Sequence, residues 1–360
     1  MDRNQATGLF LIAALLLVYL FFFSPKKDDK TAGKQPTATE AAKTPATPAT
    51  TPGFEPAAPL DSAAGPVRDD LQLKNANLTV TFSTRGGRIT AVRLNKYKTF
   101  FGQPMDLLDA QSARLDTRFR TIDGKTVKFS DLNFTASEVA GGSQLTFTAP
   151  VAGGQVVQTY SLPKDSYELK YNLKLNGLAG RVAQEPLTFT FNDQVRQTEQ
   201  DAKQNRNHST INFSYASGQN DALAEASEKP EVTTLSEPTR WVAHKHDFFV
   251  AGFIADSQPF SGGTLNTAAD MADSAKYLKR MGSLVQLPVA DVTSAAGGQY
   301  RFFFGPNSFN LLKEVAPEFD RNVYLGWGLF RWMNRFVVLP VFHLLEQFIS
   351  SYGIIIALLV

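Results

Sequence analysis

The side chains best suited to chemistry lie close together, between Trp241 and Asp247, where the sequence reads WVAHKHD. Residues two apart on a β-strand point to the same side, so His244 and His246 could share a metal ion. A third ligand would have to come from elsewhere, with His208 or Asp247 as candidates. We favour the simpler interpretation of two ordinary hydrogen-bonding side chains beside an apolar strand, because a histidine pair without a recognisable third ligand is a weak signal.

Other signs of catalysis or cofactor binding are weak. Arg85-Gly86-Gly87-Arg88 lacks the spacing and the following Lys-Ser/Thr of a phosphate loop, and a hairpin turn explains it. No Gly-x-Ser-x-Gly element occurs. A chain with no cysteine can form neither a disulfide nor a thiolate zinc site, and a net charge of +2 gives no broad footprint for nucleic acid. We therefore predict no enzyme activity, cofactor, metal or nucleic-acid partner.

The elements that carry these residues are predicted to be strands. Between Val67 and Arg301 the hydrophobic pattern has a period of two, and Gly-Gly pairs separate the apolar runs. Many short strands with one polar face predict antiparallel sheets packed as a sandwich, within a domain covering residues 67–320. The clearest alternating runs are Tyr167 to Leu175, Leu78 to Phe82, Leu145 to Phe147, Leu187 to Phe191 and Phe302 to Phe304.

Two segments depart from the strand pattern. Asn307 or Ser308 is predicted to cap a short helix over Leu311 to Val315, which Pro317 closes. Residues Gln197 to Pro238 are polar and rich in Gly, Ser and Glu, so we predict long loops or an insertion there.

The N-terminal region predicts a membrane anchor and a tether. Gly8 to Phe23 is an uncharged apolar run without a small-x-small cleavage site after it, which favours an uncleaved anchor over residues 1–24. Residues 25–66 are rich in Pro, Thr and Ala and predict a disordered linker, with an end-to-end distance of roughly 35 Å. Lysines after the anchor weakly favour an N-terminus outside the cytoplasm.

The C-terminal region becomes apolar and aromatic again from Tyr324 onward. Residues 321–351 predict an amphipathic helix lying in the membrane interface, with an interruption at Pro340. Residues 352–360 read as the start of a transmembrane helix, and because the apolar run stops at Val360 we expect a truncated chain. The side chains predicted to lie at the membrane interface are Trp327, Phe330, Arg331, Trp332, Arg335 and Phe336.

Three stretches in the right order resemble the YidC family of bacterial membrane protein insertases, within the YidC/Oxa/Alb group. They are the anchor that begins at Met1, the strand-turn-strand Ser83 to Lys98, and the run from Tyr300 to Val360. The segment from Trp241 to Phe249 also fits. Together these stretches cover both ends of the chain and several points between them.

The resemblance implies an anchor with a cytoplasmic N-terminus, opposite to the lysine count, followed by a periplasmic β-supersandwich. It implies a multi-pass protein of the bacterial inner membrane, with residues about 25–325 in the periplasm and an interfacial elbow helix leading into the second transmembrane helix. Four further membrane helices, which would form a hydrophilic groove, would lie beyond Val360. The groove would lower the cost of moving polar loops across hydrocarbon, without nucleotide.

The partners that the resemblance implies are nascent membrane proteins, the Sec translocon with its ancillary subunits, the lipid bilayer and, through the missing C-terminal part, the ribosome. Two alternatives stay open. One is a signal-anchored periplasmic protein that binds carbohydrate or resembles mutarotases, which would need a catalytic His and Glu in a cleft. The other is an inert envelope scaffold.

Overall fold

The described part of the chain is mainly antiparallel β-structure, which confirms the predicted fold class. The predicted anchor, residues 1–24, and residues 25–65 of the predicted linker lie outside the described residues. The computed structural model describes residues 66–138, 142–271, 277–326, 332–349 and 351–359.

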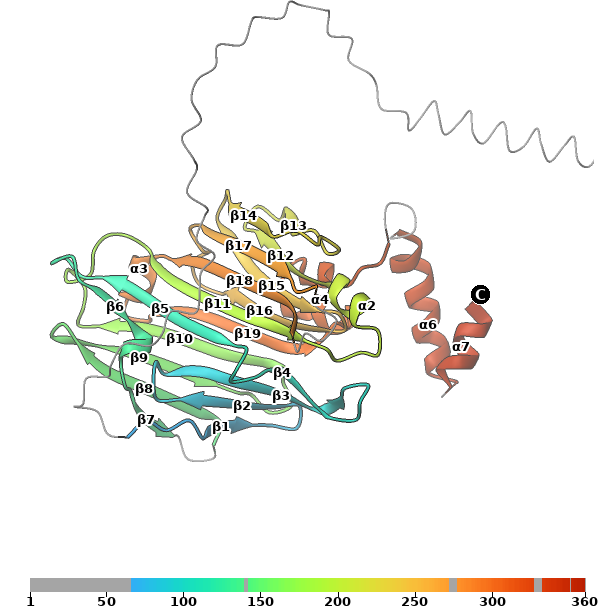
Figure 1. Ribbon diagram of the computed structural model, residues 1–360, viewed down its shortest axis with the longest axis horizontal. Coiled ribbons are helices and arrows are strands. Elements are labelled where there is room, and N and C mark those ends of the chain that lie inside the picture. Colours follow the sequence, from blue (N-terminus) through green and yellow to red (C-terminus); the bar gives the residue numbers. More distant parts are fainter. Residues whose placement is uncertain (1–65, 139–141, 272–276, 327–331, 350, 360) are drawn as a thin grey trace, which may run out of the picture. The chain divides into compact units, whose positions relative to one another are not determined.

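Three sheets make up the β-domain (Figure 1). The first has four strands in sequence order, β1 (Leu71–Lys74), β2 (Leu78–Ser83), β3 (Arg88–Lys98) and β4 (Pro104–Leu108). The second has nine, in the order β13 (Asn220–Ala222), β12 (Ser209–Tyr215), β15 (Thr239–His246), β16 (Phe249–Ala255), β19 (Gly298–Pro306), β10 (Glu168–Asn176), β9 (Gly154–Ser161), β8 (Gln144–Val151) and β7 (Thr135–Glu138). The third has six, in the order β14 (Glu231–Leu235), β17 (Gly263–Ala269), β18 (Tyr277–Leu287), β11 (Leu187–Arg196), β5 (Arg114–Arg120) and β6 (Thr126–Lys128).

Aromatic side chains join both smaller sheets to one face of the nine-stranded sheet. Phe82 of β2 packs on Tyr160 of β9 with ring centroids 4.9 Å apart, and Phe189 of β11 packs on Phe253 of β16 at 4.4 Å. All four rings are buried. The predicted alternation is therefore the inward face of a sandwich, which places its apolar residues away from water.

The Arg85-Gly86-Gly87-Arg88 segment is the β2–β3 turn, as predicted. Gly87 has a φ of +58°, and a Cβ there would lie 2.5 Å from Nε2 of Gln158. The carbonyl of Gly87 accepts a hydrogen bond from the Tyr160 hydroxyl at 3.0 Å, and that of Gly86 accepts one from Gln158 at 2.9 Å. This turn is thus fixed to the nine-stranded sheet by buried polar contacts, and only glycine fits at position 87.

The prediction of loops over Gln197 to Pro238 was wrong. This segment contains α2 (Ala202–Asn207) and strands β12, β13 and β14, and every residue of β12 is buried. Its polar side chains misled the sequence reading because their hydrogen bonds make burial tolerable. Thr210 donates to the Leu223 carbonyl at 2.8 Å, and Asn212 donates to Oδ1 of Asn322 at 2.8 Å.

A second, smaller core lies on the other face of the nine-stranded sheet. It joins Trp241 and Phe303 to α4 (Phe309–Val315) and the 3₁₀ turn η2 (Phe319–Asn322). Strands β15 and β16 are buried on both faces as a result. Strand β16 therefore reads as a continuous apolar run, whereas β15 also buries the polar side chains of His244, Lys245 and His246. The predicted helix after Ser308 is confirmed, although the Ser308 side chain makes no capping hydrogen bond. Two shorter elements are η1 (Phe129–Asp131) and α3 (Val289–Val292).

Residues Val323 to Gly326, called the exit segment below, leave the β-domain without regular structure. Beyond the gap follow a π-helical turn, η3 (Asn334–Val338), then α6 (Leu339–Glu346) and α7 (Tyr352–Leu359). The predicted interruption at Pro340 is not a break, because the helical backbone continues through it. The wider π turn just before Pro340 accommodates a residue that has no N–H and crowds the preceding turn.

Candidate functional site

His244 and His246 face the same side of β15, as predicted, and both point into the sandwich. Opposite them lies Asp193 of β11, whose Oδ2 is 2.9 Å from Nε2 of His246 and 3.3 Å from Nδ1 of His244. Nε2 of His244 is 2.6 Å from the hydroxyl of Ser283 on β18. The Phe191 ring stacks on the His244 ring at 4.3 Å. We call Asp193, His244, His246 and Ser283 the buried His–Asp cluster.

Electrostatics favour an ionised Asp193. Burial by itself opposes ionisation, but the nearby His246 and His244 more than offset this and hold the pKa of Asp193 well below its ordinary range. The 3.3 Å approach of Nδ1 of His244 lacks hydrogen-bond geometry, and this nitrogen and Oδ1 of Asp193 have no hydrogen-bond partner. The cluster is therefore a charged group inside the core, held by two imidazoles.

The alternative of a metal site finds no support here. The two candidate third ligands pair with each other, with Nδ1 of His208 3.2 Å from Oδ1 of Asp247. Within the described ranges, no group of three or more His, Asp or Glu side chains is placed to hold a metal ion. Because His244 and Asp193 have no exposed side-chain surface, a sugar could not reach them.

Sequence reasoning missed Asp193, although a signal was present. The inward positions of β11 read Leu187, Phe189, Phe191, Asp193 and Val195. Burying a carboxylate among inward-facing apolar residues costs free energy unless the carboxylate is paired. Its position therefore predicts a basic partner across the sandwich.

A second buried charge lies next to the cluster. Lys279 of β18 is 1% exposed, and its ammonium donates to the carbonyls of Ser209 and Glu225 at 2.7 Å each. Ser209 is paired with His246 in the sheet. Burial lowers the pKa of Lys279 from 10.5 to about 8.

The lowered pKa of Lys279 predicts that the free energy of unfolding rises with pH. Between about pH 8 and 10.5 the unfolded chain keeps a proton that the folded chain has released, so folding becomes more favourable as pH rises. Across this range the free energy of unfolding of the parent, relative to that of Lys279→Met, should rise by about 3 kcal/mol. Urea unfolding of both proteins at pH 7.5 and pH 10 would check it, and a difference that does not change with pH would contradict it.

The predicted membrane-interface residues lie only partly within the described chain. Trp327, Phe330 and Arg331 fall outside it. Trp332 and Phe336 are 57% and 59% exposed, with ring centroids 5.9 Å apart.

Arg335 contacts the β-domain and keeps 35% of its side-chain surface exposed, so its predicted place in the interface stays a prediction. Its guanidinium lies 3.7 Å from the Asp320 carboxylate and 5.5 Å from the Phe309 ring centroid.

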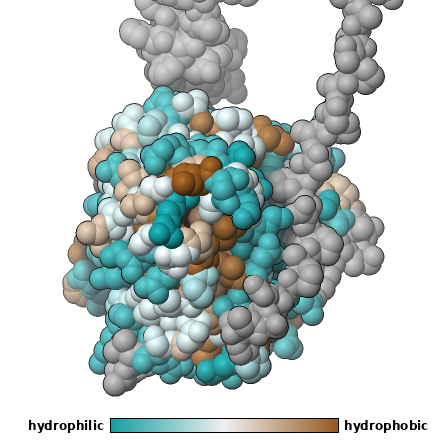
Figure 2. Space-filling model, turned by 90° about the vertical axis from the view of Figure 1, so that its left-hand side faces the viewer, coloured by the Kyte–Doolittle hydropathy of each residue, from teal (hydrophilic) through white to brown (hydrophobic). Residues whose placement is uncertain are grey.

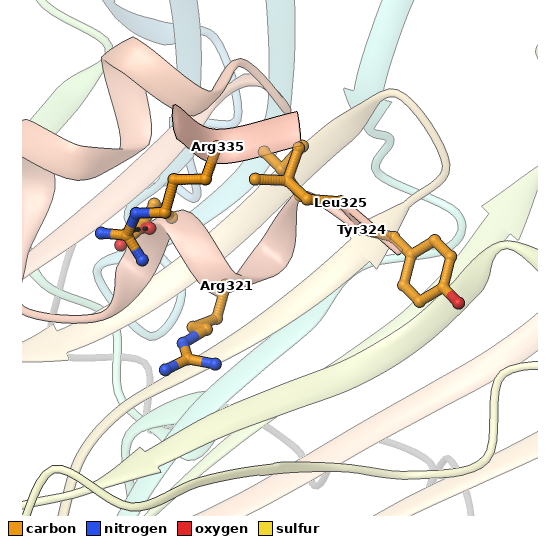
Figure 3. A pocket seen from close by; sticks show the side chains of 6 residues that line it. Arg321, Tyr324, Leu325 and Arg335 are labelled. Carbon is orange, nitrogen blue, oxygen red and sulfur yellow. Dashed lines mark ion pairs between the residues drawn. The ribbon is translucent and has the colours of Figure 1, made fainter. Parts of the chain in front are cut away.

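A small cavity of about 50 Å³ lies where Arg335 meets the exit segment (Figure 3). In Figure 3 Arg335 points toward the Arg321 side of this cavity, while the Tyr324 ring points away from it. The amide of Asn334 donates to the Leu325 carbonyl at 3.0 Å. The cavity is too small for more than a water or two. It is therefore a packing gap between η2 and the following helix rather than a ligand site.

Exposed apolar side chains gather in the C-terminal helical part. In Figure 2, by contrast, the visible face of the β-domain is mostly hydrophilic, with apolar atoms grouped near its top and along its middle. Within the described residues no helix has the length and apolar character needed to cross a membrane. The exposed apolar residues are Trp332, Met333, Phe336, Val337, Val341, Leu344, Phe348, Tyr352, Ile354, Ile356 and Leu358.

Known proteins resemble this chain along its whole length. The family described as YidC periplasmic domain matches residues 70–339. "Membrane protein insertase YidC" of Amoebophilus asiaticus is 31% identical, covering 100% of this chain and 62% of that protein. The protein of the same name from Cytophaga hutchinsonii is 34% identical, covering 99% of this chain and 60% of that protein.

This chain thus spans about three-fifths of the length of these relatives. Among solved structures, a galactose mutarotase related enzyme from Lactobacillus acidophilus aligns with a TM-score of 0.37 at 10% identity, covering 65% of this chain and 97% of that one. A likeness of this size carries no functional argument. The family match spans most of the β-domain and reaches into α6, and the two relatives cover almost every residue; the chain belongs to the YidC family.

Proposed function

We propose that this chain is the anchor and periplasmic part of a membrane protein insertase of the bacterial inner membrane. The whole protein would insert and help fold integral membrane proteins, alone or with the Sec translocon. The observation that carries the proposal is the family match over residues 70–339, joined to relatives named as insertases. The exposed apolar residues after Gly326 support it, because monomeric soluble proteins rarely leave such a surface uncovered.

We further propose a division of labour along the chain. Residues 1–24 would anchor it, 25–66 would tether it, 67–320 would form the periplasmic accessory domain, 321–351 the interfacial elbow and 352–360 the start of the second transmembrane helix. The protein would be multi-pass, with residues about 25–325 in the periplasm. It would work by physical partitioning rather than covalent chemistry, with nascent membrane proteins, lipid and the Sec machinery as partners and the ribosome contacting a part beyond Val360.

Depletion of the protein in its host tests the insertase function. Protease protection of a newly made membrane protein should fall on depletion and recover when the full-length gene is restored. A gene lacking the codons for residues 324–360 should not restore it, because the accessory domain would lose its connection to the membrane helices. Normal insertion throughout depletion would refute the function.

The elbow is tested with a peptide covering residues 324–350. Changing Arg331 and Arg335 to glutamate should weaken its binding to anionic liposomes, since each basic residue near the headgroups contributes about 1 kcal/mol. The loss for two residues is at least about 2 kcal/mol, or roughly thirtyfold in affinity. Fluorescence of Trp327 and Trp332 reports binding. The Arg331→Lys, Arg335→Lys peptide is the control and should bind like the parent, and equal binding by the glutamate peptide would reject the role of these arginines.

The carbohydrate-binding alternative gains no support from the described residues. Its candidate histidines are buried in the sandwich against Asp193. A sugar-binding or mutarotase-like protein would need these histidines to line a cleft that a sugar can enter.

A further inference from the structure

Three large apolar side chains are exposed at the tips of two turns of the β-domain. Phe100 and Phe101 occupy the β3–β4 turn and are 60% and 54% exposed, with their rings edge to face at 5.6 Å. Phe248 lies in the β15–β16 turn and is 61% exposed. A single exposed phenylalanine needs no explanation, but an adjacent pair with a third nearby does. We call these three residues the aromatic tips.

Hydrogen bonds and a ring contact place the two turns at the same end of the domain. The Phe100 amide donates to the Thr198 carbonyl at 2.8 Å, and the Thr198 amide donates to Asn205 at 3.0 Å. Asn205 in turn reaches Asp247, the neighbour of Phe248, at 3.5 Å. At the base of the same turns the Tyr97 and Phe249 rings meet edge to face at 5.2 Å.

The exit segment leaves from this same end. The Asn307 amide N–H donates to the Phe248 carbonyl at 2.7 Å, and its side chain donates to the Asn322 carbonyl at 3.0 Å. Asn322 directly precedes the exit segment, in which Tyr324 is 69% exposed. The aromatic tips therefore lie where the chain departs toward the residues proposed to enter the membrane interface.

The charges around the tips suit a lipid surface. Lys96 and Lys98 are exposed on β3 just before Phe100, and α2 adds Lys203 and Arg206. Three acidic side chains lie in the same region. Glu199 and Asp201 reach the surface, whereas Asp247 is buried beside His208, so basic side chains predominate at the surface. Aromatic rings beside lysines are the mixture that inserts at headgroup depth, with the rings at the acyl boundary and the ammonium groups at phosphates.

We propose that the aromatic tips are a second membrane contact, which seats this end of the β-domain on the outer surface of the bilayer. The contact rests on the proposed function, since it requires the domain to be held next to a membrane. A bilayer fits better than a protein partner because the three rings are exposed at the tips of turns and basic side chains lie beside them. The domain would then be held by its exit segment and by these turns together.

The absence of cysteine permits a direct test on the full chain. Two single-cysteine variants are each labelled with an environment-sensitive fluorophore. Gln103→Cys lies in the β3–β4 turn beside the aromatic tips, and Ile122→Cys lies in the β5–β6 turn, at the opposite end of the β-domain in Figure 1. The protein is reconstituted in vesicles of phosphatidylcholine and phosphatidylglycerol. We expect the label at 103 to shift to shorter wavelength and to be quenched by spin-labelled lipid, and the label at 122 to be quenched only by aqueous iodide.

Substitutions then assign the effect to the rings. Phe100→Ser with Phe101→Ser should abolish the lipid quenching at 103, while Val232→Ser, which removes another exposed apolar side chain, should leave it intact. Equal behaviour of the labels at 103 and 122 overturns the proposal. Shielding at 103 that appears only in native membranes overturns it in favour of a protein partner.

A third label separates this proposal from the proposed function. Leu344→Cys reports on α6 alone. Lipid quenching at 344 without quenching at 103 refutes the second contact and keeps the interfacial helix. If spin-labelled lipid does not quench the label at 344, the interfacial helix itself is refuted.

Discussion

Asp193→Leu should lower the free energy of unfolding of the β-domain by about 3–5 kcal/mol, the usual cost of removing one partner from a buried ion pair. The substitution leaves His244, His246 and Ser283 facing an apolar side chain in a site without access to water. The same change at exposed Asp69 should stay within about 0.5 kcal/mol. Urea unfolding of a fragment covering residues 66–326 measures both, since Trp241 is its single tryptophan.

The pH dependence follows from the low pKa of Asp193. A carboxylate whose folded pKa is depressed contributes stability above its unfolded pKa and loses it as pH falls through the folded value. The difference between the parent and Asp193→Leu should therefore begin to narrow only below about pH 4, where the unfolded aspartate takes up its proton. An unfolding midpoint unaffected by Asp193→Leu at pH 7 would show that the cluster contributes nothing to stability.

Phe319→Ala should release α4 and η2 from the sheet, with a cost of about 3–5 kcal/mol for the lost aromatic side chain. The Phe319 ring packs edge to face on Trp241 at 4.9 Å and on Phe303 at 5.5 Å. It is the fully buried side chain of the second core that comes from η2. The Trp241 emission should shift to longer wavelength and hydrogen exchange should rise over residues 309–322, while Tyr324→Ala should change neither.

A change on the sheet side gives an independent check of the same contact. A Cβ at Gly252 would lie 2.7 Å from Cζ of Phe319, so Gly252→Ala should displace the ring and reproduce the increase in exchange over residues 309–322. Strong exchange protection in both variants would mean that these segments are held by something other than the second core.

Much of the fold could be predicted because its strands carry local signals. The alternation from Leu169 to Leu175 appears in the structure as the buried face of β10, and Gly86-Gly87 forms the expected turn. Period and turn chemistry are properties of neighbouring residues, so a single sequence contains them. The family resemblance was likewise visible in ordered local stretches and is confirmed.

What could not be predicted depends on partners distant in sequence. The burial of Asn212 depends on Asn322, and the His244–His246 pair has its carboxylate partner in Asp193. Composition alone made β12 look like a loop, and the spacing of the two histidines alone suggested a metal. The interface role of Trp332 and Phe336 stays a prediction that their exposure supports.

The position of β19 has a consequence for biosynthesis. This last strand of the domain is inserted between β10 and β16, so that Leu169 is paired with Phe302. Because a ribosome makes the chain from its N-terminus, β10 and β16 must wait with unpaired edges until residue 306 has been made. Open strand edges invite pairing with other chains, so this interval is the point at which the domain is most exposed to aggregation. Substitutions that weaken β19 should therefore reduce the yield of folded protein more than they reduce its stability once folded.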